Sequence, residues 1–118
     1  MSISVLLVDD HPVVRSGLRA VLESAEDLQI IGEAATGEEA VTLAGHLHPY
    51  VVLCDLRLGE GMDGVGVTEA LRETPQRPAV LILTTFDNDS DIARAVLAGA
   101  AGYLLKDAEP EEIVQGIA

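Results

Sequence analysis

The stretch VVLCDLRLGEG, residues 51–61, places a carboxylate directly after four apolar residues. An apolar run of this length, bounded by turn-forming glycines, is typical of a strand that is buried on both faces of a sheet. A charge at the end of such a strand lies at the edge of the sheet rather than in the core. Asp55 is therefore a candidate for chemistry at that edge.

Short apolar runs recur along the chain and predict five strands. They span residues 3–8, 28–34, 51–54, 79–83 and 101–105, and the second and fifth runs are weaker. Between them, apolar residues recur at the spacing of one helix face. The predicted helices cover about 14–25, 40–47 after a capping box from Thr36 to Glu39, 65–74, 90–98 with Gly99 as terminator, and a fifth from Pro110. Five strand–helix units predict an α/β fold with an open, doubly wound parallel sheet.

Length and charge exclude several classes of protein. The chain has 118 residues, which suits one domain over residues 1–118, and its net charge of −13 repels phosphate backbones and anionic lipid headgroups. No segment approaches the roughly 18 apolar residues of a membrane span. The one cysteine, Cys54, lies in an apolar run without a partner, which suits a reducing compartment. We therefore expect a cytoplasmic protein that binds neither membranes nor, by itself, nucleic acid.

Polar residues follow four of the predicted strands. They are Asp9 and Asp10, Asp55, Thr84 and Thr85, and Lys106. In doubly wound sheets, ligands bind beyond the carboxyl ends of the strands. Three carboxylates that converge there repel one another unless a cation lies among them, and oxygen ligands with no histidine or cysteine beside them suit Mg²⁺. With Lys106 also present, the charges balance, and such a site can receive a transferring phosphoryl group while a carboxylate attacks in line.

These residues, in matching order and spacing over essentially the whole chain, resemble the receiver domain of two-component response regulators. The resemblance implies a flavodoxin-like sheet with strand order 2-1-3-4-5 and five helices. It also implies that Asp55 is the nucleophile that accepts a phosphoryl group from the phosphohistidine of a sensor histidine kinase. Asp10, Asp55 and the Arg57 backbone carbonyl would hold Mg²⁺, and Asp9 would support the metal through water.

The resemblance assigns three further residues to the switch. Lys106 would pair with the phosphoryl oxygens, the Thr84 hydroxyl would swing to one of them, and Tyr103 would rotate inward behind it. Phosphoaspartate is a mixed anhydride that should hydrolyse, so we expect a self-limiting signalling switch rather than a turnover enzyme. The pairing of two copies in a homodimer stays open.

The residues of three segments resemble those of one subfamily, the receivers of LuxR-type (NarL-like) transcription factors. These segments are Asp-Asp-His-Pro at 9–12, Gly-Leu-Arg at 17–19 and Gly-Tyr-Leu-Leu-Lys-Asp at 102–107. In that subfamily a helix-turn-helix output domain follows the receiver. None is present in this sequence, which stops about two turns into its fifth helical pattern. We therefore expect DNA binding and control of transcription only from a longer parent chain.

One segment departs from the family pattern. The family usually has Met-Pro-Gly-Met-Asp-Gly after the acceptor strand, whereas residues 58–64 are Leu-Gly-Glu-Gly-Met-Asp-Gly, with no proline and one extra residue. Glycine increases the conformational freedom of the backbone, whereas proline restricts it. We expect the Gly59-Glu60-Gly61 loop to be more flexible than usual and, since Arg57 stands at its start, Mg²⁺ to bind more weakly.

Several alternatives stay open at this point. Asp9 and Asp10 could simply cap the first helix, and the adjacent pair Thr84 and Thr85 leaves open which hydroxyl is the switch. His11 is interpreted as a helix-start residue near the site rather than a catalyst. A haloacid-dehalogenase-type phosphatase would need a second aspartate where Arg57 stands, and a flavodoxin-type carrier would need a phosphate-binding loop after the first strand. Neither the cognate kinase nor its signal follows from the sequence.

Overall fold

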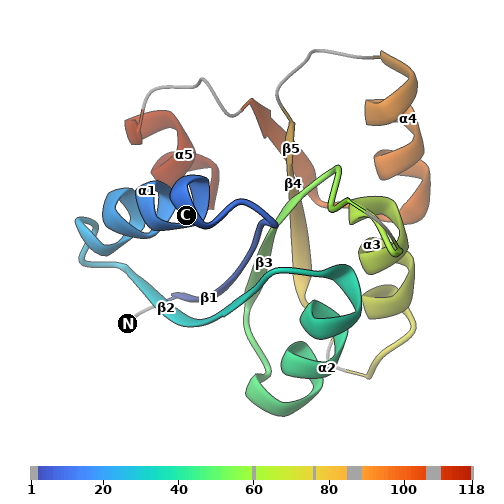
Figure 1. The fold of residues 1–118 in the computed structure, drawn as a ribbon, viewed down its shortest axis with the longest axis horizontal. Helices are drawn as coiled ribbons and strands as arrows, with labels where there is room; N and C mark the ends of the chain where they lie inside the picture. The colour runs from blue at the N-terminus through green and yellow to red at the C-terminus, as the bar shows by residue number, and fades with distance from the viewer. Residues whose placement is uncertain (1–2, 60, 76, 85–88, 106–109, 118) are drawn as a thin grey trace.

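The five predicted strands and five predicted helices are present and alternate along the chain (Figure 1). The computed structural model describes residues 3–59, 61–75, 77–84, 89–105 and 110–117. The strands are β1 (Ile3–Val8), β2 (Leu28–Ala34), β3 (Val51–Asp55), β4 (Ala79–Thr84) and β5 (Gly102–Leu105). The helices are α1 (Pro12–Glu23), α2 (Gly37–Leu47), α3 (Gly64–Arg72), α4 (Asp89–Ala98) and α5 (Pro110–Ile117). Within these ranges, no helix is both long and apolar enough to cross a membrane.

The strands form one parallel sheet in the order β2-β1-β3-β4-β5, which confirms the predicted fold class and strand order. The strand order reverses at β1, which pairs with β2 on one side and with β3 on the other. Val8 at the end of β1 is in register with Cys54 in β3. The residues that follow them, Asp9 and Asp55, are therefore neighbours at the switch point, where doubly wound sheets place their ligand sites.

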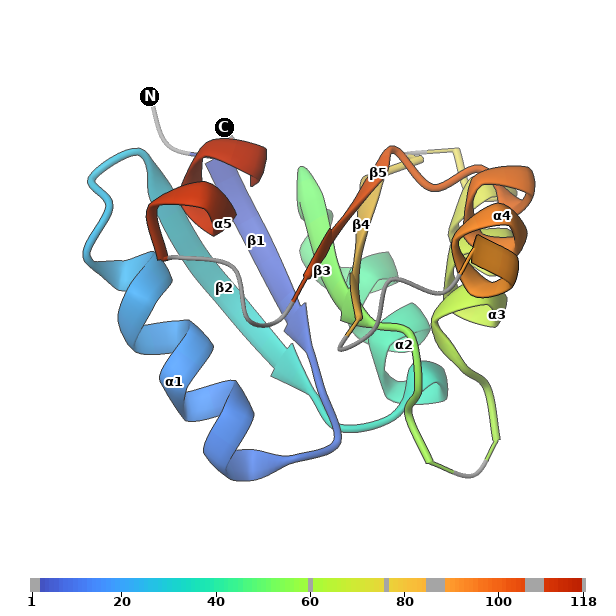
Figure 2. The same ribbon diagram turned by 90° about the horizontal axis from the view of Figure 1, so that it is seen from above.

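Helices cover both faces of the sheet, which explains the near-continuous apolar character of the strands. Helices α1 and α5 lie on one face, and α2, α3 and α4 lie on the other (Figure 2). Successive strand residues point to opposite faces. Leu6 and Val8 accordingly belong to the core beneath α2, α3 and α4, while Val5 and Leu7 belong to the core beneath α1 and α5. Complete burial of each such side chain stabilises the fold by roughly 1.5–3 kcal/mol.

Local sequence signals set most helix boundaries. The predicted capping box begins α2, because the Thr36 hydroxyl accepts a hydrogen bond from the Glu39 backbone N–H over 3.1 Å. Helix α3 ends at Arg72, two residues before the predicted end. Its last turn tightens, since the Thr74 N–H donates to the Leu71 carbonyl over 3.2 Å, and Pro75 then disfavours further helix.

Candidate functional site

The turn after β1 fixes the first two carboxylates. Asp9 is fully buried, and its backbone N–H donates to the Ala34 carbonyl of β2 over 3.1 Å. Its carboxylate Oδ1 accepts a hydrogen bond from the His11 backbone N–H over 2.9 Å, and its carbonyl accepts one from Arg15 Nη1 over 2.7 Å. The turn therefore holds Asp10, whose side chain is 28% exposed, at the edge of the sheet.

Asp55 ends β3 and is also buried, with 5% of its surface exposed. The next residue, Leu56, continues toward β4 by donating its N–H to the Leu83 carbonyl over 2.9 Å. The Arg57 N–H donates to Asp55 Oδ1 over 3.4 Å, which orients the carboxylate. Asp55 thus lies at the carboxyl edge of the sheet, as the sequence predicted, and its side chain is buried there.

The carboxylates of β1 and β3 converge with one imidazole. One ligand atom from each of Asp9, Asp10, His11 and Asp55 can be chosen so that all four lie within 4.8 Å of one another. Asp10 Oδ1 is buried and receives no hydrogen bond of acceptable geometry from the described residues. Three carboxylates this close carry unbalanced negative charge, and a cation among them would relieve the repulsion. A buried carboxylate oxygen and an oxygen-rich donor set fit Mg²⁺.

The structure corrects one part of the sequence interpretation. The sequence placed His11 near the site but indicated only oxygen ligands, whereas His11 Nδ1 lies 2.9 Å from Asp10 Oδ1 and 3.4 Å from Asp9 Oδ1. His11 does stand at the N-cap of α1, as expected for a helix-start residue, but its side chain makes no cap hydrogen bond. The imidazole therefore belongs to the cluster. The sequence signal that could have indicated this position is the Asp-Asp-His order, in which His11 directly follows the two aspartates.

Cys54, which precedes Asp55, is not a ligand of this cluster. Burial raises the pKa of its thiol far above the ordinary value, and the negative charge of Asp55 raises it further. The side chain is a protonated thiol, whereas metals bind the thiolate. Cys54 is instead a packed residue of the hydrophobic core.

The glycine-rich loop between β3 and α3 has an anchor that the sequence did not reveal. Glu38, near the start of α2, accepts a hydrogen bond through Oε2 from the Met62 backbone N–H over 3.2 Å. Gly61 has φ +87°, and a Cβ there would lie 2.7 Å from that carboxylate. A Cβ on Gly37 would likewise lie 2.7 Å from the Met62 carbonyl. Small residues on both sides thus let the loop lie against α2.

The two ends of this loop are tied to the site and to α3. A Cβ on Gly59, which has φ +73°, would lie 3.4 Å from Asp10 Oδ2, so the loop backbone passes close to that carboxylate. At the other end, the Gly64 N–H donates to the Leu56 carbonyl over 2.9 Å, and Asp63 caps α3 by accepting from Gly66 N–H over 2.9 Å. The expectation of weaker Mg²⁺ binding stays a prediction, because it concerns affinity.

The remaining predicted residues come from β4 and β5. Thr84 ends β4 and is buried, with 6% of its surface exposed, one residue beyond the pairing of Leu83 with Asp55. Tyr103 lies in β5 and is 44% exposed, so its ring is not in the inward position that the resemblance implies for the switched state. Lys106 and the alternative switch residue Thr85 lie outside the described residues.

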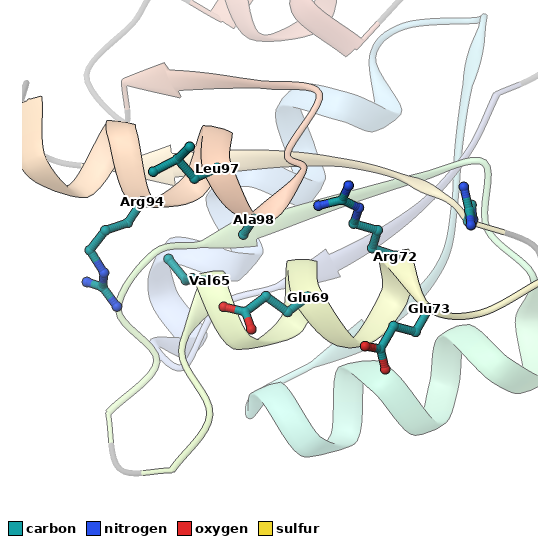
Figure 3. Close-up of a pocket in the computed structure, with 8 residues that line it drawn as sticks. Val65, Glu69, Arg72, Glu73, Arg94, Leu97 and Ala98 are labelled. Carbon is teal, nitrogen blue, oxygen red and sulfur yellow. The ribbon is translucent and has the colours of Figure 1, made fainter.

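A groove of about 590 Å³ lies elsewhere, between α3 and α4 (Figure 3). Its lining includes three of the seven basic residues of the chain, Arg72, Arg77 and Arg94. Two carboxylates, Glu69 and Glu73, line the same groove and offset two of these charges. No residue of the acidic cluster lines it, so this groove is separate from the edge of the sheet where the carboxylates meet.

The fold and the cluster of aspartates together define the class of protein. An open parallel sheet of order 2-1-3-4-5 with buried aspartates at its switch point is a flavodoxin-like α/β domain with an acidic site. The model of the response regulator receiver domain matches residues 5–118, and the chain belongs to that family.

Known proteins that resemble the chain are regulators of the predicted subfamily. The transcriptional regulatory protein LiaR of Bacillus subtilis is 44% identical over 98% of this chain and 54% of its own length. The nitrate/nitrite response regulator protein NarL of Escherichia coli is 36% identical over 97% of this chain and 52% of its own length. The chain thus spans about half the length of the curated relatives it matches.

Solved structures support the same assignment. A two-component response regulator of the LuxR family from Aurantimonas superposes with a TM-score of 0.93 at 35% identity, covering 99% of this chain and 83% of that one. The response regulator ChrA of a heme-sensing two-component system superposes with a TM-score of 0.82 at 45% identity, covering 98% and 55%. The predicted resemblance to receivers of LuxR-type, NarL-like regulators is confirmed.

Proposed function

We propose that this receiver domain is a phosphorylation-operated switch in which Asp55 accepts a phosphoryl group from the phosphohistidine of a sensor histidine kinase. The observation that carries the proposal is the position of Asp55. This residue is 5% exposed at the end of β3, and its carboxylate contributes to the cluster formed with Asp9 and Asp10. A carboxylate held among other carboxylates at a strand end is suited to nucleophilic attack once their charge is balanced.

The donor set suits a hard divalent cation. Asp10, Asp55 and the backbone carbonyl of Arg57 would hold Mg²⁺, with Asp9 supporting it through water. When bound, Mg²⁺ supplies positive charge that stabilises the oxygens of a transferring phosphoryl group. Asp9 and Asp10 then keep their charges without repelling the nucleophile, while the Arg57 N–H keeps Asp55 Oδ1 oriented.

The proposed transfer step uses these residues as follows. A carboxylate oxygen of Asp55 attacks phosphorus in line, and the new P–O bond forms as the P–N bond of the donor breaks. The electron pair of that bond leaves with the donor imidazole nitrogen, which then takes a proton. Lys106 would pair with the phosphoryl oxygens, and the Thr84 hydroxyl would donate to one of them. The product is an acyl phosphate that water cleaves, so the domain is a self-limiting switch and not a turnover enzyme.

The output belongs to a longer protein. The chain covers about half of LiaR and NarL, whose names describe a transcriptional regulator and a response regulator. We infer that a parent chain carries a DNA-binding output domain, and that phosphorylation shifts Thr84 and Tyr103 inward and changes the surface of α4, β5 and α5. That surface, or a homodimer formed through it, would carry the signal to transcription.

The test uses acetyl phosphate as a small phosphoryl donor. The chain is incubated with acetyl phosphate and Mg²⁺, and intact-protein mass spectrometry is used to count the phosphoryl groups gained. We expect one group on the wild-type chain, none on Asp55→Asn, and none when EDTA removes the divalent cation. Glu23→Gln, a change of an exposed acid on α1, is the matched control and should be labelled like wild type. Labelling of Asp55→Asn to the wild-type level would overturn the proposal.

A further inference from the structure

The His11 side chain does not cap the helix that it begins and instead approaches the carboxylates of Asp9 and Asp10. His11 is the N-cap residue of α1, with φ −102° and ψ 110°, and residues at this position commonly bond their side chain to the first turn of the helix. The His11 side chain makes no such bond. Its Nδ1 instead lies 2.9 Å from Asp10 Oδ1 and 3.4 Å from Asp9 Oδ1. The imidazole is thus directed at the carboxylates.

The separation of His11 Nδ1 from Asp10 Oδ1 matches that of neighbouring ligands on one ion. Ligand atoms at about 2.0–2.1 Å from a six-coordinate cation lie about 3 Å apart when adjacent and about 4 Å apart when opposite. The 2.9 Å from His11 Nδ1 to Asp10 Oδ1 has the adjacent size, and the 3.4 Å to Asp9 Oδ1 lies between the adjacent and the opposite size. An ion that contacts Asp10 Oδ1 is therefore within reach of His11 Nδ1.

An imidazole ligand changes which cation the site prefers. Mg²⁺ favours oxygen ligands, whereas first-row transition metal ions bind imidazole nitrogen well and follow a rising order of affinity from Mn²⁺ toward Cu²⁺. We propose that His11 is a metal ligand that makes this site select transition metal ions such as Mn²⁺ over Mg²⁺. The proposal rests on the cation site of the proposed function and deepens it.

A second explanation of the same distances makes a different prediction. If His11 only contacts Asp10 and does not bind the metal, its removal changes the binding of Mg²⁺ and Mn²⁺ to a similar degree. If His11 is a ligand, its removal weakens Mn²⁺ selectively. The ratio of the two dissociation constants therefore separates the explanations.

The experiment titrates MnCl₂ and MgCl₂ separately into the full chain by calorimetry, for wild type, His11→Ala and His46→Ala. His46 lies in the last turn of α2, outside the acidic cluster, and serves as the matched histidine control. The work is done at about pH 8, because protons compete with metals for imidazole nitrogen. Even the loss of an outer-shell partner weakens metal binding roughly 10–100-fold, so we expect His11→Ala to lower the Mn²⁺ preference at least about tenfold. His46→Ala should keep the wild-type ratio.

A spectroscopic measurement supports the calorimetry. Pulsed electron paramagnetic resonance of bound Mn²⁺ detects coupling to a directly bound nitrogen, which we expect in wild type and His46→Ala but not in His11→Ala. Equal changes of both affinities in His11→Ala, or the absence of nitrogen coupling in wild type, would overturn the assignment.

Phosphoryl labelling of the wild-type chain in Mg²⁺ keeps this test separate from that of the proposed function. If wild type is labelled but His11→Ala keeps the wild-type metal preference, the assignment of His11 fails and the switch stands. If wild type is not labelled but its Mn²⁺ preference depends on His11, the switch fails and the metal site stands.

Discussion

Two connections carry the acidic site, and they are held in different ways. The turn after β1 is short, and its contacts are mostly local, with Asp9 bonded to His11 and to Arg15. The loop after β3 is longer and glycine-rich, and its central contact comes from Glu38, 24 residues earlier in the chain. A short turn can be encoded by its own residues, whereas a long loop depends on a partner supplied by the fold.

The largest expected effect comes from adding a side chain at Gly64, where the long loop joins α3. A Cβ on Gly64 would lie 2.7 Å from the Asp55 carbonyl oxygen and 2.9 Å from Leu56 Cα, and neither backbone atom can move away easily. We expect Gly64→Ala to lower the free energy of unfolding by about 2–3 kcal/mol, measured by urea denaturation. Gly45→Ala is the control, because a Cβ there meets nothing within 4 Å. That change in the α2 interior should stabilise by about 0.5–1 kcal/mol. Equal effects of the two substitutions would contradict this account.

The short turn should depend on Arg15. Its guanidinium donates to the Asp9 carbonyl over 2.7 Å and to Glu33 over 3.0 Å, and its side chain is only 21% exposed. We expect Arg15→Met to lower the free energy of unfolding by about 1–2 kcal/mol, since two charge-assisted hydrogen bonds are lost. Arg19→Met, which removes a more exposed arginine paired with Glu33 and Glu23, should have a smaller effect. An equal loss from the two variants would show that Arg15 does not anchor the turn.

A smaller effect is expected at the remote anchor of the long loop. Glu38→Ala removes the acceptor of the Met62 N–H, which should cost about 1 kcal/mol and weaken Mg²⁺ binding up to about fivefold. Hydrogen exchange of the Met62 amide should become faster. Glu38→Gln keeps an acceptor oxygen and should restore much of the protection. Unchanged Met62 exchange in Glu38→Ala would mean that the loop is held by its glycine contacts alone.

The smallest effect concerns the missing proline. Gly59 has φ +73°, which proline cannot adopt, so Gly59→Pro alone should weaken Mg²⁺ binding. Deletion of Glu60 together with Gly59→Pro restores the family's loop length. We expect this variant to bind Mg²⁺ about two- to fivefold more tightly by calorimetry, in line with the roughly 0.4–1 kcal/mol that a compatible proline contributes. Binding no tighter than wild type would reject the hypothesis that the loop weakens the site.

The same contrast explains what the sequence could predict. Strand ends, helix caps and the positions of Asp9, Asp10 and Asp55 follow from apolar runs and local signals, and parallel strands bring their carboxyl ends together. The direction of the His11 side chain does not follow, because a residue at a helix start can either cap the helix or point away from it. The Glu38 contact does not follow either, since no local pattern links α2 to a loop so far along the chain.

The buried Cys54 also provides a chemical probe of motion next to the proposed acceptor residue. It is the single thiol of the chain, it is fully buried, and it directly precedes Asp55. Alkylating reagents attack the exposed thiolate, and this thiol is buried and its pKa is raised, so modification requires β3 to open first. The rate of alkylation therefore reports how readily the strand that carries Asp55 opens, and no cysteine has to be engineered for the measurement. The rate can be compared before and after metal or phosphoryl donor is added.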